Sequence, residues 1–312
     1  MNRLTQEATA FAPATIANVA VGFDVLGFAF DDVGDRVTVR RSDNPGVRIA
    51  SVSGESLPAD PQENTAGVAL LSMIEDIDLQ EGFDVELQKG IPLSSGLGGS
   101  AASAVGAVVA ANHLLERPRS REDLLPYALA GEAVASGAAH GDNVVPCLFG
   151  GLVAVIPGAS GMTPVHLPVP NLHCVLVRPN IQLATKAQRQ VLPATISLTE
   201  HARQSAYLAG FVSALHTGDV ALMRTTMQDL IVGPCRSTAI PGFNGMRSAA
   251  MDSGAVGCGI SGSGPTVFAW CDAEIASSVQ DAMLTSLQGQ AESVDSWSGA
   301  IGGVGARVVE EL

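Results

Sequence analysis

The sequence is short of cations and has no long apolar run. Its 312 residues include 17 Lys or Arg against 31 Asp or Glu, a formal net charge of −14. Nucleic acids and anionic membranes are bound largely through Lys and Arg that neutralise phosphates, so neither is an expected partner. The longest apolar run, residues 101–115, is too short and too rich in alanine to span a bilayer. Glu7, Pro13 and Asn18 interrupt any signal-peptide core, so the expected location is cytoplasmic.

The cysteines show no pattern that would suggest a disulfide framework or a zinc site. There are five, an odd number, scattered without C-x-x-C spacing at Cys147, Cys174, Cys235, Cys258 and Cys271. We expect them to be small buried side chains.

The most informative segment is glycine-rich: PLSSGLGGSAAS, residues 92–103. It follows a strand-like segment, Phe83 to Lys89, and opens a run of small apolar residues, Ala104 to Leu115, that is typical of a buried helix. A glycine-rich turn at a helix N-terminus presents unpaired N–H groups and the positive end of the helix dipole. The segment therefore predicts an anion site, and the expected anion is a nucleotide phosphate.

Two better-known phosphate loops fit this segment poorly. A Walker loop needs a lysine directly after its glycines, and the only two lysines, Lys89 and Lys186, are elsewhere. The segment does satisfy the loose G-x-G-x-x-A pattern of dinucleotide-binding folds. However, residues 92–95 separate it from its strand, and the acidic residue expected about 20 residues later, Glu116, falls at a helix end. A lysine-free phosphate loop is favoured, with a dinucleotide site and a packing turn as alternatives.

The rest of the chain mixes strand-like and helix-like segments, which indicates an α+β protein with two layers per domain. A turn cluster at residues 157–161 is the best candidate for a domain boundary, giving a nucleotide-binding domain at 1–160 and a second domain at 161–312. Strands are predicted at 36–41, 47–52, 83–89, 152–156, 172–178, 257–260, 265–270 and 306–310, and helices at 65–77, 100–115, 121–135, 184–191, 199–216, 219–231, from 243 to about 251, and 273–287.

Three blocks, taken together, resemble the GHMP small-molecule kinases. They are PATIAN at 13–18 continuing to GFDVLG at 22–27, the glycine-rich loop, and GCGISGSGPT at 257–266. Within that superfamily, GAAHGDNVVP at 137–146 and TKAQR at 185–189 are similar to the homoserine kinases. The resemblance covers the chain from Phe11 onward. It implies a ribosomal-S5-like N-terminal domain, a ferredoxin-like C-terminal domain, ATP bound between them, and a homodimer.

The sequence departs from the family pattern in the loop and in the first block. Gly99 stands where the loop usually has serine, which leaves Ser100 as the hydroxyl after the glycines and could weaken phosphate contacts. Ile16 and Val21 replace the usual serine and proline of the first block.

The resemblance assigns the loop to ATP and two oxygen donors to Mg²⁺. Ser100 would offer its hydroxyl to the metal, and Glu132 matches the family's metal carboxylate; the alternative for Glu132 is a solvated helix residue. Asn64 either caps the helix that begins at Thr65 or touches adenine. The expected ATP-binding residues are Asn64, Pro92, Leu93, Ser94, Ser95, Gly96, Leu97, Gly98, Gly99, Ser100, Ala101 and Ala102.

The resemblance also implies L-homoserine as the acceptor, a zwitterion that needs a cation for its carboxylate and an anion for its ammonium group. Arg189 is the family match for the carboxylate and Arg236 is a second candidate, since a guanidinium binds a carboxylate with two parallel hydrogen bonds. Asp142 would meet the ammonium group, beside His140.

Asn18 and Asp24 would orient the attacking hydroxyl. Asp24 and Asn143 are the candidate catalytic residues, and whether the reaction uses a general base is left open. The loop at 261–264 is expected to pack against the phosphate loop.

Two other functions are compatible with these residues. One is a GHMP kinase for another small alcohol. The other is a GHMP-fold protein without catalysis that senses a nucleotide or metabolite.

Overall fold

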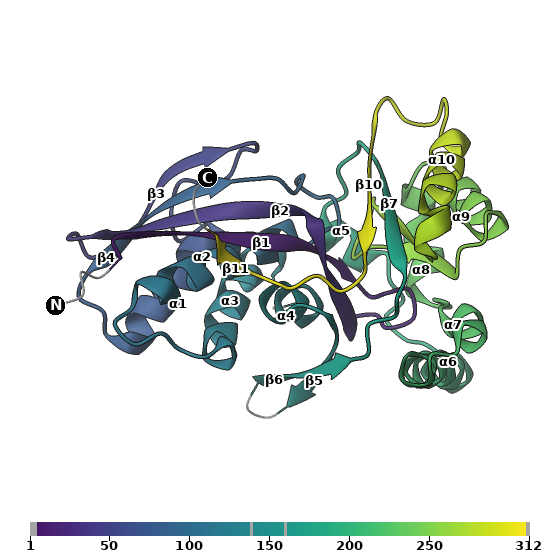
Figure 1. Ribbon diagram of the computed structural model, residues 1–312, viewed down its shortest axis with the longest axis horizontal. Helices are drawn as coiled ribbons and strands as arrows, with labels where there is room; N and C mark the ends of the chain where they lie inside the picture. The colour runs from purple at the N-terminus through teal and green to yellow at the C-terminus, as the bar shows by residue number, and fades with distance from the viewer. Residues whose placement is uncertain (1–4, 138–139, 159–160, 310–312) are drawn as a thin grey trace.

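The computed structural model describes residues 5–137, 140–158 and 161–309, and it has two lobes (Figure 1). The first lobe contains a seven-stranded sheet in the order β11-β1-β2-β4-β3, with β5 paired to β2 and β6 to β5. All pairs are antiparallel except β3 and β4. The strands are β1 (Glu7–Ala17), β2 (Leu26–Ser42), β3 (Gly46–Ser53), β4 (Gly82–Gln88), β5 (Leu152–Gly158), β6 (Gly161–Leu167) and β11 (Arg307–Val309).

Four helices lie against one side of this sheet (Figure 1). They are α1 (Thr65–Ile77), α2 (Gly99–Leu114), α3 (Arg121–Ser136) and α4 (Gly141–Phe149). α2 packs on β1 and β2 and also contacts α1 and α3, which explains its composition of small residues. At Gly106, for example, a Cβ would lie 2.6 Å from a methyl carbon of Val37.

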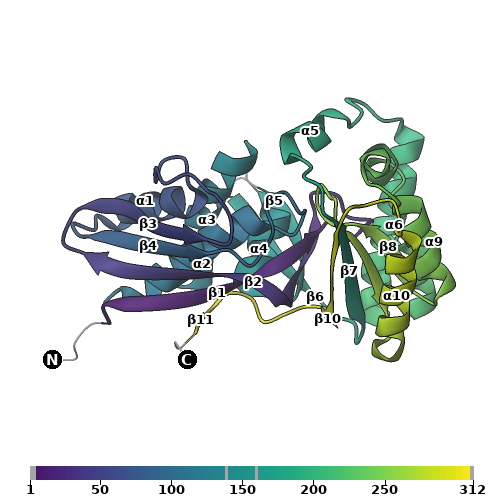
Figure 2. The same cartoon turned by 90° about the horizontal axis from the view of Figure 1, so that it is seen from above.

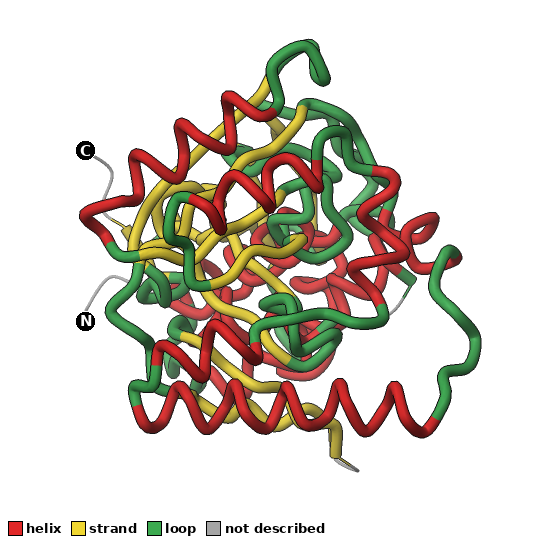
Figure 3. Tube along the Cα trace, turned by 90° about the vertical axis from the view of Figure 1, so that its right-hand side faces the viewer, coloured by secondary structure: helices red, strands yellow, loops and turns green. Residues whose placement is uncertain are grey.

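The second lobe is a four-stranded antiparallel sheet in the order β10-β7-β9-β8. Its outer face is covered by α9 and α10, which lie on the side away from the first lobe (Figure 2). Viewed from this end of the molecule, helices lie in front of strands (Figure 3). The elements are β7 (His173–Pro179), α5 (Thr185–Gln190), α6 (Leu198–Thr217), α7 (Val220–Thr226), α8 (Val232–Arg236), η1 (Ser237–Ala239), α9 (Phe243–Asp252), β8 (Gly257–Ile260), β9 (Val267–Cys271), η2 (Ala273–Ile275), α10 (Ala276–Ser286) and β10 (Val294–Ala300).

The inner face of the second sheet joins the core of the first lobe. The Trp270 ring on β9 packs edge-on against Phe28 of β2, with ring centroids 5.5 Å apart, and lies 5.8 Å from Phe211 of α6. All three side chains are fully buried. The two lobes therefore share apolar packing on the side of the molecule where β1 ends and β2 begins.

The turn cluster predicted as a domain boundary lies within one lobe. Its described residues, Pro157, Gly158 and Gly161, belong to the β5–β6 hairpin of the first sheet, while residues 159 and 160 lie outside the described part of the chain. The second sheet begins at β7, and β11 returns to pair with β1. Turn residues mark where a chain reverses but do not show which sheet the next strand joins.

The predicted helix at 219–231 is wrong in its second half. α7 begins after its predicted cap, Asp219, whose side chain accepts a hydrogen bond from the Leu222 amide, but the helix ends at Thr226. The Asp229 carboxylate then accepts hydrogen bonds from the amides of Ile231, Val232 and Gly233, and the chain starts the separate helix α8 there. β1, the first part of β2, α4, β6 and β10 were not predicted. Glu310, the predicted end of the last strand, lies outside the described residues.

Among the residues that the structure describes, no helix is both long and apolar enough to cross a membrane. The five cysteines are free, and four of them are buried as expected, but Cys235 is only half-buried.

Candidate functional site

A cavity of about 450 Å³ brings together most of the residues that the sequence singled out. Its wall comes from the end of β1, the glycine-rich loop, the starts of α1, α2 and α4, and from α3, α5, α8 and the β8–β9 loop. The predicted residues that line it are Asn18, Asp24, Asn64, Pro92, Leu93, Ser94, Ser95, Gly96, Gly98, Gly99, Ser100, Glu132, His140, Asp142, Asn143, Arg189 and Arg236. Leu97, Ala101 and Ala102 do not line it, because their side chains are fully buried beneath the loop and along α2.

The glycine-rich loop delivers the N-terminus of α2 to the cavity. Gly96 and Gly98 adopt left-handed φ angles of 78° and 68°, and the cap residue Gly98 offers no side chain to the first amides of the helix. A Cβ on Gly98 would lie 2.0 Å from Thr15 Oγ1, and one on Gly96 would lie 2.4 Å from the Ser261 carbonyl oxygen. Only glycine fits both positions, and the first N–H groups of this 16-residue helix have no side-chain cap, an arrangement that suits an anion.

The β8–β9 loop packs against this glycine-rich loop, as predicted. The Ser261 hydroxyl donates to the Gly96 carbonyl at 2.7 Å, and the Thr266 hydroxyl donates to the Ser95 carbonyl at 2.7 Å. Gly262 also donates its amide to the Ala17 carbonyl at the end of β1. These bonds therefore tie the β8–β9 loop of the second lobe to the glycine-rich loop and to the end of β1 in the first lobe.

Lys89 supports the loop from below, a role that was not predicted from the sequence. It is buried, forms an ion pair with Asp35, and donates to the Gly99 carbonyl at 2.7 Å and the Ser103 hydroxyl at 2.9 Å. Asp35 also accepts the amides of Gly90 and Ile91. The only available signal was the position of Lys89 at the end of the strand that enters the loop.

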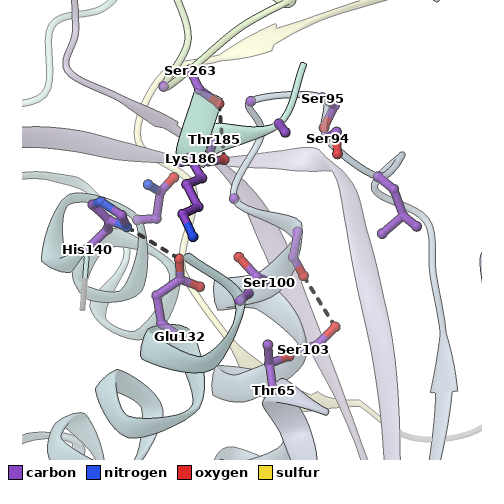
Figure 4. A pocket seen from close by; sticks show the side chains of 18 of the residues that line it. Thr65, Ser94, Ser95, Ser100, Ser103, Glu132, His140, Thr185, Lys186 and Ser263 are labelled. Atoms are coloured by element: carbon purple, nitrogen blue, oxygen red, sulfur yellow. Dashed lines mark hydrogen bonds and ion pairs between the residues drawn. The ribbon is translucent and has the colours of Figure 1, made fainter. Parts of the chain in front are cut away.

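Ser100 and Glu132 face the same part of the cavity from α2 and α3 (Figure 4). Glu132 is buried, so it is not the solvated helix residue of the alternative prediction. Its Oε1 lies 3.7 Å from Nδ1 of His140, and this carboxylate raises the pKa of His140. A hydroxyl and a carboxylate beside a phosphate site are the hard oxygen donors that Mg²⁺ accepts, so these residues fit the metal.

Asp24 and Arg189 form a two-pronged ion pair across the cavity. Their contacts are 2.5 Å between Nη2 and Oδ2 and 3.3 Å between Nη1 and Oδ1. The same Nη1 lies 3.1 Å from Nε2 of His140. In the neutral imidazole, an arginine donor makes Nε2 the acceptor and leaves the proton on Nδ1, toward Glu132.

Arg236 lies deeper in the wall. Only 4% of its surface is exposed, and burial lowers its pKa. Its guanidinium donates to the Gln188 carbonyl at 3.3 Å and to the Gly262 carbonyl at 2.8 Å. The cavity therefore has two arginines of different kinds: Arg236 is buried and held by carbonyls, whereas Arg189 is exposed and paired with Asp24.

The polar residues at the start of α4 and the end of β1 complete the acceptor end. Asp142 is buried, which raises its pKa to about 7, with a further contribution from nearby Asp24. Asn143 accepts a hydrogen bond from the Thr15 hydroxyl at 2.9 Å. Asn18 accepts from the Asp24 amide at 3.1 Å and donates to the Gly262 carbonyl at 3.0 Å.

Lys186 is a second residue that the sequence analysis did not assign. It lines the cavity from α5, and its side chain extends toward Glu132 and Ser100 (Figure 4). It lies three residues before Arg189, a spacing that places both side chains on one side of a helix. Asn64 acts as the cap of α1, accepting from the amides of Ala66 and Gly67, and it also reaches the cavity wall.

Comparison with known proteins places the fold. The family model described as "GHMP kinases N terminal domain" matches residues 64–151, and "GHMP kinases C terminal" matches residues 211–288. A homoserine kinase of Chlorobium phaeobacteroides is 42% identical over 96% of this chain and 99% of that protein. The chain belongs to the homoserine kinase family of GHMP kinases.

Further members of the family agree with this assignment. A homoserine kinase of Xylella fastidiosa is 50% identical over 85% of this chain and 82% of that protein. The crystal structure of homoserine kinase from Cytophaga hutchinsonii superimposes with a TM-score of 0.95 at 42% identity, covering 99% of each chain. The predicted α+β, two-domain GHMP kinase fold is confirmed.

Proposed function

We propose that this protein transfers the γ-phosphoryl group of ATP to the hydroxyl of L-homoserine, giving O-phospho-L-homoserine for threonine biosynthesis. One observation carries the proposal. A single cavity has an uncapped helix N-terminus at one end and, at the other, a set of carboxylates and guanidiniums suited to a zwitterion.

The triphosphate lies on the amides of residues 96–101, with Lys186 facing it across the cavity. Ser100 and Glu132 are the residues that would hold Mg²⁺, which when bound neutralises charge on the phosphates. Phosphoryl transfer needs positioning and charge neutralisation more than covalent help from the protein. An acidic chain can meet that need here because the loop uses main-chain dipoles rather than side-chain cations.

Homoserine binds by exchanging charges with groups that are already paired. Its carboxylate takes the place of the Asp24 carboxylate on Arg189, and its ammonium group lies beside Asp142. The exchange frees Asp24 to accept a hydrogen bond from the homoserine hydroxyl. That oxygen then attacks the γ-phosphorus, the bond to the β,γ-bridging oxygen breaks, and the hydroxyl proton passes to Asp24.

The remaining polar residues position the acceptor. The Thr15 contact engages Asn143 Oδ1, so the NH₂ group of Asn143 is the part that contacts the acceptor oxygen. Asn18 holds the Asp24 backbone, and His140 holds Arg189. A sugar or mevalonate has no ammonium group and would leave Asp142 without a counter-charge, so these acceptors fit less well.

An acceptor panel scored by ADP release tests the proposal. Purified protein with Mg²⁺ and ATP should release ADP with L-homoserine and not with galactose or mevalonate. Equal turnover of galactose or mevalonate, with none of homoserine, would identify a kinase for another alcohol. ATP binding without turnover of any acceptor would identify a nucleotide sensor.

We also propose a homodimer, which the family resemblance supports, and a cytoplasmic location, which the interrupted N-terminal apolar pattern supports. Sedimentation equilibrium of the purified chain tests the first, and fractionation of the source cells tests the second.

A further inference from the structure

Two guanidiniums of the acceptor end lie over one aromatic ring. The Arg189 Cζ atom is 5.5 Å from the centroid of the Phe23 ring, and the Arg236 Cζ atom is 5.2 Å from it. Both distances fall within the range of a cation–π interaction. Phe23 thus links an exposed arginine on α5 with a buried arginine on α8.

This arrangement solves a problem of charge. Two guanidiniums that converge on one carboxylate repel each other, and an acidic partner that neutralised them would compete with the carboxylate of the substrate. The face of an aromatic ring attracts both cations and adds no further anion to Asp24, which already pairs with Arg189. An incoming carboxylate takes the N–H donors of Arg189 that hold Asp24, whereas Nε and Nη1 of Arg236 donate to the Gln188 and Gly262 carbonyls.

Phe23 acts from outside the acceptor cavity. Both arginines line the main cavity, and among the described residues Phe23 is not part of that wall. The ring lines a separate, mainly apolar cavity of about 350 Å³, with Leu192, Ile196 and Leu208. A change of ring size at residue 23 can therefore be accommodated on the side away from the substrate.

The backbone that carries the ring is tightly fixed. Gly22 donates to the Asn18 carbonyl at 2.8 Å, and Leu26 donates to the Gly22 carbonyl at 2.9 Å. A Cβ on Gly22 would lie 2.3 Å from the Leu26 side chain. The turn therefore presents Phe23 and Asp24 together, one to the arginines' faces and the other to an edge of Arg189.

We propose that Phe23 is a positioning residue that holds Arg189 and Arg236 as one carboxylate clamp, and so selects acceptors that carry a carboxylate. The inference rests on the proposed function. Because Phe23 is not among the residues that line the acceptor cavity, we expect its effect to be confined to substrate groups that the arginines bind.

The test compares two acceptors in the Phe23→Leu variant. One is L-homoserine, and the other is 3-aminopropan-1-ol, which keeps the hydroxyl and the ammonium group but lacks the carboxylate. The variant should raise the KM for homoserine by about 10-fold, the effect of two modest cation–π contacts, with little change in kcat or in the KM for ATP. For 3-aminopropan-1-ol, the kcat/KM, or its Ki as a competitor of homoserine, should stay within about twofold of wild type.

Two further variants separate positioning from structural damage. Phe23→Trp, which keeps an aromatic face and can extend into the second cavity, should restore the KM for homoserine. Phe11→Leu removes a similar ring that lies outside the cavity, with its centroid 5.9 Å from Arg36 Cζ and 4.9 Å from Arg307 Cζ. This variant should leave the kinetic constants for both acceptors unchanged.

Equal losses for both acceptors in Phe23→Leu, or no rescue by Phe23→Trp, would overturn the role of Phe23. An unchanged KM in Phe23→Leu would do the same. Failure of the wild-type protein to phosphorylate homoserine would instead refute the proposed function, so the two results can be told apart.

Discussion

The two ends of the cavity are built in different ways. The phosphate end is main chain: glycines with left-handed φ angles, the amides of α2, and carbonyls held by Ser261, Thr266 and Lys89. The acceptor end is side chain: Asp24 and Arg189 are 35% and 45% exposed and meet across the cavity from a turn and a six-residue helix. One end is fixed before any ligand arrives, and the other can exchange partners.

This difference matches the chemistry of the two ligands. A triphosphate presents many equivalent oxygens, and a fixed array of N–H donors can bind them without reorganisation. A small zwitterion presents one carboxylate and one ammonium group, so selectivity depends on placing a few charges correctly. Changes at the phosphate end should affect every acceptor, whereas changes at the acceptor end should affect only acceptors that carry the group contacted by the altered residue.

The largest effect is expected from Gly98→Ala. The new Cβ would lie 2.0 Å from Thr15 Oγ1, and residue 98 has a left-handed φ that alanine rarely adopts. The loop must therefore move, and its amides no longer point at the phosphates. We expect kcat/KM for ATP to fall by about 100-fold or more. The control is Gly218→Ala, at φ 67° with nothing within 4 Å of the added atom, which should keep full activity. An active Gly98→Ala enzyme would show that the main chain does not form the phosphate site.

Arg189→Ala should be next in size. Loss of the exposed guanidinium removes about 1.5–3 kcal/mol of binding to the homoserine carboxylate, which is about 10- to 100-fold in KM. The KM for ATP should change little. Arg189→Lys keeps the charge but not the two-pronged geometry, so its KM for homoserine should lie between those of the wild type and Arg189→Ala. Wild-type values of KM and kcat in Arg189→Ala would exclude this residue from the site.

The acceptor end should also depend on pH. Burial raises the pKa of Asp142 to about 7, so below pH 7 this carboxyl takes up a proton and loses the charge that faces the ammonium group. Between pH 8 and 6, kcat/KM for homoserine should fall by about 10-fold. Asp142→Asn should be less active and flat over this range. If the variant kept the wild-type slope, another group would be responsible.

Lys186→Met should have a smaller effect, and the affected substrate should be ATP rather than homoserine. The lysine faces the phosphate end, so kcat/KM for ATP should fall by about fivefold while the KM for homoserine stays close to wild type. Lys186→Arg should recover most of the loss. Arg203→Met, which removes an exposed cation of α6 outside the cavity, is the matched control. A rise in the KM for homoserine instead would place Lys186 at the acceptor end.

The smallest change is expected from Gly99→Ser, which restores the residue common in the family. An added Cβ would lie 3.3 Å from a methyl carbon of Ile91 and 3.5 Å from Lys89 Nζ, so a slight shift of Ile91 makes room. Activity should stay within about twofold of wild type, because the contacts of the Gly99 carbonyl to Lys89 and Ser103 are main-chain contacts and are kept. A gain of about 10-fold would mean that the missing hydroxyl limits the phosphate site.

The local structure around the glycine-rich loop could be predicted from the sequence because its signals are local. The helix at 65–77 was predicted with its true bounds, since Asn64 caps it and apolar residues recur at helical spacing. The glycine-rich loop is a local signal of the same kind, because its glycines indicate the left-handed φ angles that Gly96 and Gly98 adopt. β1 was missed because nine of its eleven residues, all except Glu7 and Phe11, are buried, which gives a nearly continuous pattern without alternation.

The acceptor end was predicted as a set of residues but not as an arrangement. Asp24 and Arg189 are 165 positions apart, and nothing in either segment shows that they pair. The stacking of both arginines on Phe23, the buried Lys89–Asp35 pair and the reach of Lys186 are also tertiary facts. Motifs identify the kinds of side chain in a site, whereas the folded chain decides their partners.

The most direct test of the two-ended cavity is a crystal structure with a non-hydrolysable ATP analogue and L-homoserine. We expect the analogue's phosphates on the amides of residues 96–101 and the amino-acid carboxylate on Arg189, with Asp24 released from that arginine and facing the hydroxyl. An analogue bound elsewhere, or homoserine bound while Asp24 and Arg189 stay paired, would contradict the account.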